Sequence, residues 1–207
     1  MLNVHSLEVG ALATNCYIVE DTDTKSAMII DAPDEADRIL EFVDEKGLTV
    51  TDIVLTHGHF DHIFALHDLK AKTNATVSVF EKTVAFLSDP VLNLCHYTGD
   101  EFLPFKPDRV FFDGDVLTFG KNEFKVIATP GHTEDSICLL CGDILISGDT
   151  LFYRSVGRCD HPTGDMKTEL HSIKEKLLAL PDDTKVYPGH GPSTTIGDER
   201  KENFYIL

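Results

Sequence analysis

Hydrophobic and polar positions form short, regular runs along the chain, and these runs predict an ordered series of strands and helices. A helix over residues 34–46 carries Ile39, Leu40 and Val43 on one side and ends at Gly47. The first half is predicted to contain strands at 3–9, 14–20, 25–31, 52–55 and 76–80 and helices at 34–46, 63–72 and 82–87. The second half is predicted to contain strands at 115–119, 123–129, 136–141, 143–147 and 185–187 and a helix at 167–180.

The two halves resemble weak internal repeats. Residues 17–31 and residues 137–149 each consist of a strand, a turn, a strand and an Asp. Each is followed by a helix and then by a His at a strand end, His57 in one half and His190 in the other. Two mixed sheets packed face to face, with helices outside, would bury these runs and bring the strand-end loops together. We therefore expect an α/β fold of the αββα sandwich type, with residues 1–207 in one domain.

The most informative motif is residues 56–62, with the sequence THGHFDH, directly after an apolar strand. His57 and His59 are two positions apart, so in an extended segment they project to the same side. Asp61 and His62 lie where the chain turns into a helix and can face a second point nearby. Such a cluster at a strand end is hard to explain as core packing, and it predicts a metal site.

Three later segments supply further metal-binding side chains in similar places. Each has a short β run and a Gly, followed by a His or an Asp: His132 in TPGHT, Asp149 in SGDT and His190 in YPGHG. One such segment would be weak evidence, since Pro-Gly-His also forms a simple turn. Three of them beside the first motif form a strong constellation, and imidazole and carboxylate ligands suit Zn, Fe or Mn.

The ordered motifs HxHxDH, PGHT, GDT and PGHG resemble those of the metallo-β-lactamase superfamily of binuclear hydrolases, over residues 31–203. The resemblance implies an αββα sandwich with two divalent ions, Zn or else Fe or Mn, along one edge. It implies that one ion is held by His57, His59 and His132, that the other is held by Asp61, His62 and His190, and that Asp149 bridges them. The ions would share a hydroxide that attacks a carbonyl, so Asp61 and Asp149 belong to the expected catalytic centre.

A further aspartate, Asp31, is the counterpart of Asp149 in the first half of the chain. We expect it to lie near the metals without binding them and to hydrogen-bond the metal loop. Ala32 and Pro33 follow it where the family more often has a Gly, so this loop is expected to differ in shape.

Details of the motifs narrow the expected reaction. β-Lactamases of the superfamily usually have Cys or Ser at the position of Asp149, and flavodiiron-type reductases replace His59 by Glu. Residues 155–160 and 191–200 look most like those of glyoxalase II-type enzymes, which implies hydrolysis of a thioester such as S-lactoylglutathione. Only 17 residues follow His190, so the helical domain that supplies most glutathione contacts in full-length glyoxalase II is not expected.

Two other reactions stay open. His57, His132 and Asp149 alone would form a face of two histidines and one carboxylate for a single Fe(II), as in the persulfide dioxygenases of the superfamily. Against this, Gly-Pro-Ser follows His190, where those enzymes tend to have Asp-Tyr. A lactone hydrolase would use the same metals on a ring ester. A binding domain without turnover is disfavoured, because all seven ligand positions are filled.

Substrate contacts are expected from outside the ligand motifs. Arg158 either neutralises an anionic substrate or pairs with a neighbouring aspartate. Tyr187 either donates a hydrogen bond to the substrate or packs. The irregular segment 91–107, which includes Phe102, either covers the metals or is an ordinary connecting loop. Surface or packing roles are expected for the histidines outside the motifs, of which His96 and His161 alone lie in plausible active-site loops.

Composition limits the partners and the compartment. The net charge of −17 argues against binding of nucleic acid, which needs clustered Lys and Arg, and favours a small-molecule substrate. No apolar run reaches membrane-spanning length, and residues 1–10 lack the features of a signal peptide, so no membrane association is expected and the cytoplasm is the expected location. The five cysteines are expected to be reduced, with Cys138 and Cys141 as buried strand residues.

Overall fold

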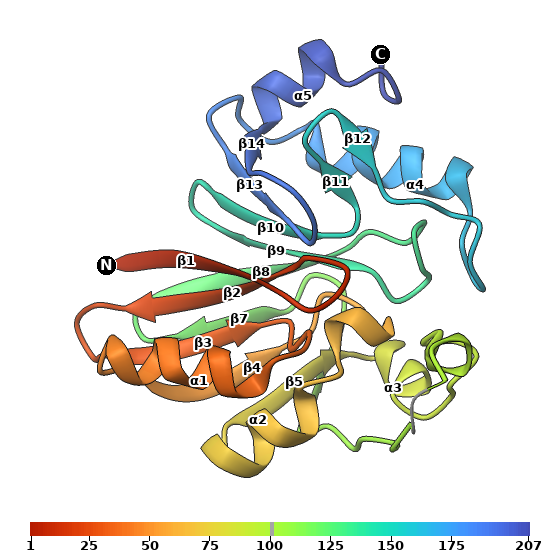
Figure 1. Cartoon of the computed structure of the whole chain (residues 1–207). Coiled ribbons are helices and arrows are strands. Elements are labelled where there is room, and N and C mark those ends of the chain that lie inside the picture. The colour runs from red at the N-terminus through yellow and green to blue at the C-terminus, as the bar shows by residue number, and fades with distance from the viewer. Residues whose placement is uncertain (100–101) are drawn as a thin grey trace.

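The computed structural model describes residues 1–99 and 102–207, which form two six-stranded sheets packed face to face (Figure 1). The first sheet consists, in spatial order, of β1 (Leu2–Val9), β2 (Thr14–Asp21), β3 (Ser26–Ile30), β4 (Thr49–Val54), β5 (Thr76–Phe80) and β6 (Arg109–Phe111). Strands β1 to β3 are antiparallel, and β3 to β6 are parallel to one another.

The second sheet repeats this mixed arrangement. It consists, in spatial order, of β14 (Thr194–Thr195), β13 (Lys185–Pro188), β10 (Ile144–Gly148), β9 (Ile137–Cys141), β8 (Asn122–Ala128) and β7 (Val116–Phe119). The β10–β13 pair is parallel and the other pairs are antiparallel. A small hairpin of β11 (Leu151–Phe152) and β12 (Ser155–Val156) follows β10.

Helices lie on the outer face of each sheet (Figure 1). On the first sheet these are α1 (Ala36–Glu45) and α2 (Leu66–Thr73), and on the second they are α4 (Met166–Ser172), which continues into the π-helical turn η3 (Ile173–Leu177), and α5 (Ile196–Glu202). The short elements η1 (Phe60–His62), α3 (Thr83–Phe86) and η2 (Cys95–Tyr97) lie in the connections. The predicted αββα sandwich is confirmed.

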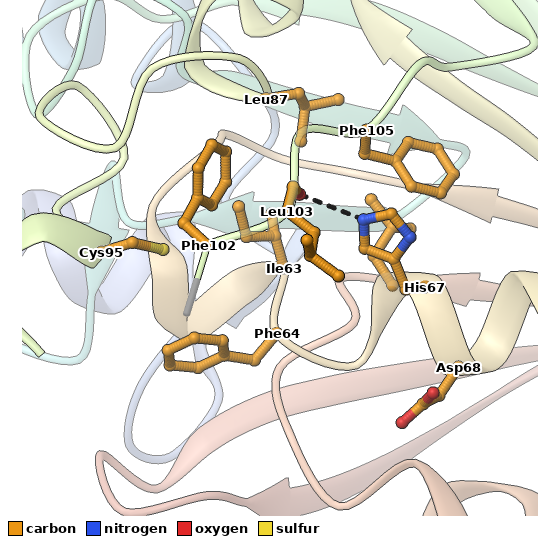
Figure 2. A pocket seen from close by; sticks show the side chains of 10 residues that line it. Ile63, Phe64, His67, Asp68, Leu87, Cys95, Phe102, Leu103 and Phe105 are labelled. Carbon is orange, nitrogen blue, oxygen red and sulfur yellow. Dashed lines mark hydrogen bonds between the residues drawn. The ribbon is translucent and has the colours of Figure 1, made fainter. Parts of the chain in front are cut away.

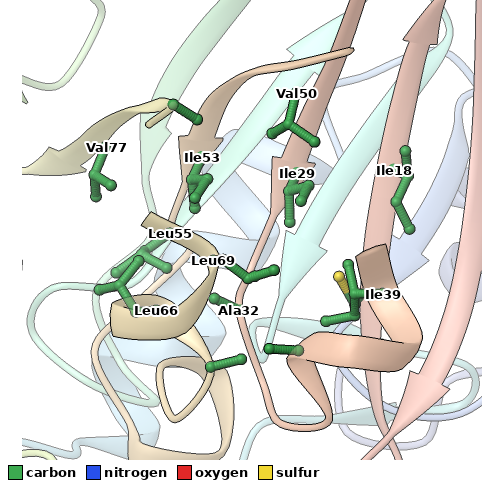
Figure 3. Packing of buried hydrophobic residues seen from close by; sticks show 14 of the residues in the cluster. Ile18, Ile29, Ala32, Ile39, Val50, Ile53, Leu55, Leu66, Leu69 and Val77 are labelled. Carbon is green, nitrogen blue, oxygen red and sulfur yellow. The ribbon is translucent and has the colours of Figure 1, made fainter. Parts of the chain in front are cut away.

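Three hydrophobic layers hold the sandwich together, and strand periodicity assigns the residues to them. In β2, Ile18 packs outward under α1 and α2, whereas Tyr17 and Val19 pack between the sheets. Figure 3 shows the outer layer, in which Ile29 of β3 and Ile39 of α1 belong to the same cluster. A third layer lies between the second sheet and α4, η3 and α5.

Several elements differ from the expected ones. The helix expected at 63–72 begins only at Leu66, because the residues before it form the turns that carry the ligands. The helix expected at 167–180 divides into α4 and the π-helical turn. Strand β6, the β11–β12 hairpin, β14 and α5 were not predicted, since each is too short to show a clear period.

The cysteines and the helices are consistent with the composition. Cys138, which is buried, and Cys141 both lie in β9, and no disulfide is present within the described ranges. None of the helices described here is long and apolar enough to span a bilayer.

Candidate metal centre

All seven predicted ligands meet at one edge of the sandwich. His57, His59, Asp61 and His62 follow β4, while the other three follow β8, β10 and β13. Three sets of three potential ligand atoms lie within 4.8 Å of one another: those of His57, His59 and His132, those of Asp61, His62 and His190, and those of His57, His62 and Asp149. We call the first two sets the first and the second ligand group.

The first ligand group consists of three buried imidazoles. His59 Nδ1 lies 2.9 Å from His132 Nε2. The ring of His57 lies 4.8 Å from that of His59 and 5.0 Å from that of His132, nearly perpendicular in both cases. Burial lowers the pKa of all three, so the histidines are neutral, which is the form that binds metals.

The second ligand group is richer in carboxylates. Asp61 Oδ2 lies 3.2 Å from His190 Nε2 and 3.6 Å from His62 Nε2. Burial lowers the pKa of His190, but the carboxylates of Asp149 and Asp61 outweigh this effect and raise it to about 10. Metal binding at this group must therefore displace protons.

Asp149 lies between the two groups. Its Oδ1 is 3.4 Å from His62 Nε2, and its Oδ2 is 3.4 Å from His190 Nε2 and 3.6 Å from His132 Nε2. Burial would raise the pKa of Asp149, but His62 and the neighbouring histidines hold it well below the ordinary value. The carboxylate is thus ionised and faces both groups.

The remaining ring nitrogens show which atoms are available for a metal. In four histidines Nδ1 is hydrogen-bonded to a group outside the two ligand groups: His57 with Thr56 Oγ1, His62 with Asp31, His132 with the Arg158 carbonyl and His190 with the Leu12 carbonyl. His59 is arranged in reverse, because its Nδ1 faces His132 Nε2 and its buried Nε2 has no partner among the described residues. Within the described part of the chain, the buried Nε2 atoms of His57 and His62 and Oδ1 of Asp149 have no hydrogen-bond partner. Unpartnered buried polar atoms are costly, and a divalent cation would satisfy these, so the donor set fits such an ion.

Asp31 holds the metal loop from behind, as predicted. It is 1% exposed, and its carboxylate accepts hydrogen bonds from the Thr56 N–H at 2.7 Å and the Thr56 hydroxyl at 2.8 Å. Its Oδ2 also lies 2.8 Å from His62 Nδ1. This contact keeps the Nδ1 proton in place and leaves His62 Nε2 free to bind a metal.

Two glycines let the backbone approach the cluster closely. A Cβ on Gly189 would lie 2.1 Å from Asp149 Oδ1 and 2.9 Å from His62 Cε1. A Cβ on Gly58, between two of the ligands, would lie 2.4 Å from the Cβ of Phe86. Neither position therefore has room for a side chain.

Glu169 is a supporting residue that the sequence analysis missed. It lies on α4, is fully buried, and accepts a hydrogen bond from the His132 N–H at 3.0 Å. Burial raises its pKa to about 8. The available signal was a charged residue one helical turn before Ile173, on the apolar side of a predicted helix.

A cavity of about 330 Å³ opens above the cluster of candidate ligands, and we call it the metal cavity. It is lined by Leu12, His59, Phe60, Asp61, Leu94, His132, Asp149, Phe152, Arg158, His161 and His190. Arg158 is mostly exposed there and forms a two-pronged ion pair with Asp160, with both N–O distances at 2.7 Å. It therefore has the pairing role that the sequence analysis left open, while it also lies at the rim of the cavity.

Tyr187 and Phe102 do not line this cavity. Tyr187 packs between the sheets, with its ring 5.6 Å from that of Tyr17. Phe102 lies in a separate apolar cavity of about 140 Å³, beside Ile63 and Phe64 (Figure 2). Among the described residues of segment 91–107, which exclude 100 and 101, Leu94 is the one that lines the metal cavity.

His67 holds residues 103 and 105 against the wall of this second cavity. Figure 2 shows His67 of α2 with its Nε2 3.1 Å from the Leu103 carbonyl oxygen. The same imidazole lies edge-on to Phe105, at 5.0 Å between ring centroids. These contacts fasten the end of segment 91–107 to α2, away from the metal cluster.

Comparison with known proteins identifies the family. The model of the metallo-beta-lactamase superfamily matches residues 9–190. The hydroxyacylglutathione hydrolase GloC of Haemophilus influenzae is 34% identical over 212 residues, which cover 99% of this chain and 98% of that protein. The probable metallo-hydrolase YqgX of Bacillus subtilis is 36% identical over 203 residues, which cover 97% of this chain and 95% of that protein.

Solved structures agree with this assignment. The B3 metallo-beta-lactamase BLEG-1 superposes with a TM-score of 0.94 at 36% identity and covers 99% of this chain and 100% of its own. The di-iron-bound form of TTHA1623 has a TM-score of 0.86 at 34% identity, with 97% and 99% covered. ETHE1 from Myxococcus xanthus has a TM-score of 0.80 at 33% identity, with 98% and 83% covered. The chain belongs to the metallo-beta-lactamase superfamily.

Proposed function

We propose that this protein is a binuclear metal-dependent hydrolase of thioesters, and that S-lactoylglutathione is the first substrate to test. The observation that carries the proposal is the pair of ligand groups with Asp149 between them and unpartnered Nε2 atoms facing inward. Two relatives support it. GloC is named a hydroxyacylglutathione hydrolase, and TTHA1623 has been solved with two irons.

The ligands are proposed to act as the sequence motifs suggest. His57, His59 and His132 would hold one divalent ion, Asp61, His62 and His190 the other, and Asp149 both. We propose Zn for both positions, with Fe or Mn as the alternatives that the same ligands accept. When bound, such ions supply a water molecule of lowered pKa and polarise the substrate carbonyl.

Other groups of the protein orient the candidate ligands and shield the site from water. Asp61 receives a hydrogen bond of 3.2 Å from the Thr14 hydroxyl, which fixes its carboxylate in the second ligand group. The Arg158 carbonyl and Leu12 carbonyl orient His132 and His190. Phe60, Leu94 and Phe152 form apolar walls that limit the access of bulk water to the scissile bond.

Three other reactions enter the same test, and two of them have support from solved structures. ETHE1 shares a third of its sequence with this chain, so a mononuclear Fe(II) persulfide dioxygenase is the second candidate. BLEG-1 is named a β-lactamase, so a β-lactam belongs among the test substrates, as does a lactone.

The deciding experiment combines elemental analysis with parallel assays. Protein from metal-supplemented medium should contain close to two metals per chain and hydrolyse S-lactoylglutathione, and chelation should abolish turnover. His190→Gln, which removes a ligand of the second group only, should retain about one metal and lose turnover. His171→Gln is the matched control on an exposed histidine of α4. A single iron with persulfide-dependent oxygen uptake and no hydrolysis would contradict the proposal.

A further inference from the structure

The cavity above the metal cluster adjoins a side groove. The groove, of about 340 Å³, is lined by Phe60, Leu94, Tyr97, Thr98, Asp160, His161 and Pro162. Phe60, Leu94 and His161 also line the metal cavity, so the groove and the cavity adjoin at these three residues. A molecule whose reacting carbonyl lies over the metals could therefore extend into the groove.

The floor of the groove is fixed to the metal loop. Phe60 donates its backbone N–H to the Asn93 carbonyl at 2.8 Å, and the buried Asn93 amide donates to the Phe86 carbonyl at 2.8 Å. Leu94 is held in the left-handed region, with φ of 67°. A leucine rarely adopts this conformation, and the bonds around Asn93 hold it there with its side chain on the groove.

His161 lies at the junction of the two spaces. Its ring is 5.3 Å from that of His59 and 5.9 Å from that of His132, nearly perpendicular to both. Within residues 1–99 and 102–207, the contacts of this ring are with His59 and His132, and its nitrogens form no hydrogen bond. These nitrogens are thus available to a ligand that passes from one space to the other.

Among the described residues that line it, the groove carries no unbalanced charge. Apart from the candidate ligand His190, Arg158 is the one cationic side chain among the described residues that line either space, and both of its guanidinium bonds go to Asp160. Asp160 is in turn the one carboxylate lining the groove in the described part of the chain. The rest of the lining is mainly aromatic or aliphatic, so an anionic ligand would find no free counter-charge there.

We propose that the side groove binds the thiol half of the thioester, that it favours an uncharged, apolar thiol over glutathione, and that His161 is a specificity residue at its entrance. This inference rests on the proposed function and specifies its substrate class. Hydrolysis adds water across the C–S bond and releases an acid and a thiol. His161 would hydrogen-bond the sulfur as negative charge develops on it.

Binding of thioethers tests the groove without requiring turnover. The two probes are analogues of the lactoyl thioesters of phenylmethanethiol and of glutathione. In each of them a methylene group replaces the thioester carbonyl. Calorimetry on the metal-loaded protein should show that the phenylmethyl thioether binds at least tenfold more tightly. Equal affinities, tighter binding of the glutathione thioether or no measurable binding of either would overturn the inference.

A positive charge introduced into the groove should reduce the preference for the phenylmethyl thioether. Tyr97 lines the groove and is 69% exposed, so Tyr97→Lys should fold normally. It should tighten binding of the glutathione thioether at least threefold and weaken that of the phenylmethyl thioether. Tyr205→Lys, at a 53% exposed tyrosine outside the groove, should change neither. Identical responses of the two variants would contradict the assignment.

The role of His161 is tested by measuring hydrolysis of substrates that differ in their thiol leaving group. His161→Phe should make the hydrolysis rate more sensitive to thiol pKa across a series of lactoyl thioesters, and His161→Gln should restore most of the normal dependence. An unchanged dependence in His161→Phe would overturn that role. If the phenylmethyl thioether binds selectively but neither thioester is hydrolysed, the proposed function fails while the groove assignment stands.

Discussion

The contact between Asp31 and His62 predicts a selective effect of Asp31→Asn on the second ligand group. The Oδ2 atom of Asp31 faces both the Thr56 hydroxyl and His62 Nδ1, at 2.8 Å each. In the variant an NH₂ group would take this place, and the Thr56 hydroxyl can rotate to accept a hydrogen bond from it. His62 Nδ1 would then have to become an acceptor, so the ring proton would move to Nε2, the atom that faces the metal position.

The size of the effect follows from the bonds affected. Hydrogen bonds to a buried carboxylate contribute about 1.5–3 kcal/mol each. The Thr56 N–H keeps its bond to Oδ1 and the hydroxyl re-forms one, so we expect metal-free Asp31→Asn to lose about 2–4 kcal/mol. Loss of a partner that orients a ligand histidine weakens metal binding about 10–100-fold. Asn tolerates the left-handed backbone of Asp31, with φ of 63°, so the substitution adds little strain.

The assay is a two-site zinc titration against a chelating dye, together with urea unfolding of the metal-free protein. The affinity of the second ligand group should fall about 10–100-fold. That of the first should fall less, because His57 is linked to Asp31 only indirectly, through the Thr56 hydroxyl. Asp34→Asn, at an exposed aspartate of the same loop, should leave both affinities and the stability unchanged. Equal loss at both groups, or loss of stability alone, would refute the tautomer argument.

Three further predictions concern the surroundings of the cluster. Gly189→Ala should abolish metal binding at the second ligand group because its Cβ would lie 2.1 Å from Asp149 Oδ1. Gly191→Ala, with no atom within 4 Å of its Cβ but φ of 74°, should lower only Tm. Equal metal content in the two variants would contradict this. Burial raises the pKa of Glu169 from 4.5 to about 8, so the unfolded chain releases this proton first, and the stability of the metal-free protein should fall as the pH rises from about 4.5 to about 8. In urea unfolding at several pH values, Glu169→Gln should lose this dependence of the unfolding free energy on pH. An unchanged dependence would mean that another titrating group causes it. Asp160→Asn should free Arg158 and lower KM for S-lactoylglutathione about threefold. Tm should change little, because an exposed ion pair contributes about 0–1 kcal/mol. An unchanged KM would mean that this guanidinium does not reach the substrate.

The clustering of the seven candidate ligands could be predicted because the information is local. HxHxDH and the Gly-His and Gly-Asp turns each place a side chain at a strand end within a few residues. The two-residue spacing of His57 and His59 then brings both rings into the first ligand group. Long strands and amphipathic helices were equally predictable from their periods.

The supporting contacts could not be predicted because they join segments far apart in the sequence. Glu169 reaches His132 from a helix 37 positions later, and no local pattern sets that distance. The groove likewise depends on the loop of Asn93 meeting that of His161. Phe102 shows the opposite case: an aromatic residue in a promising loop packs into a neighbouring cavity, since Ile63 and Phe64 offer it apolar surface there.

The internal repeat explains why two equivalent aspartates have different places. Asp31 follows β3, which pairs in parallel with β4, and Asp149 follows β10, which pairs in parallel with β13. In the first half the left-handed conformation falls on Asp31 itself, with φ of 63°. In the second half it falls one residue earlier, on Gly148, with φ of 49°. A shift of one residue at a strand end changes the direction of the following side chain, so Asp149 faces the ligand groups while Asp31 lies behind His62. The repeated pattern thus identifies both aspartates, and the backbone of a single residue decides which of them faces the metal positions.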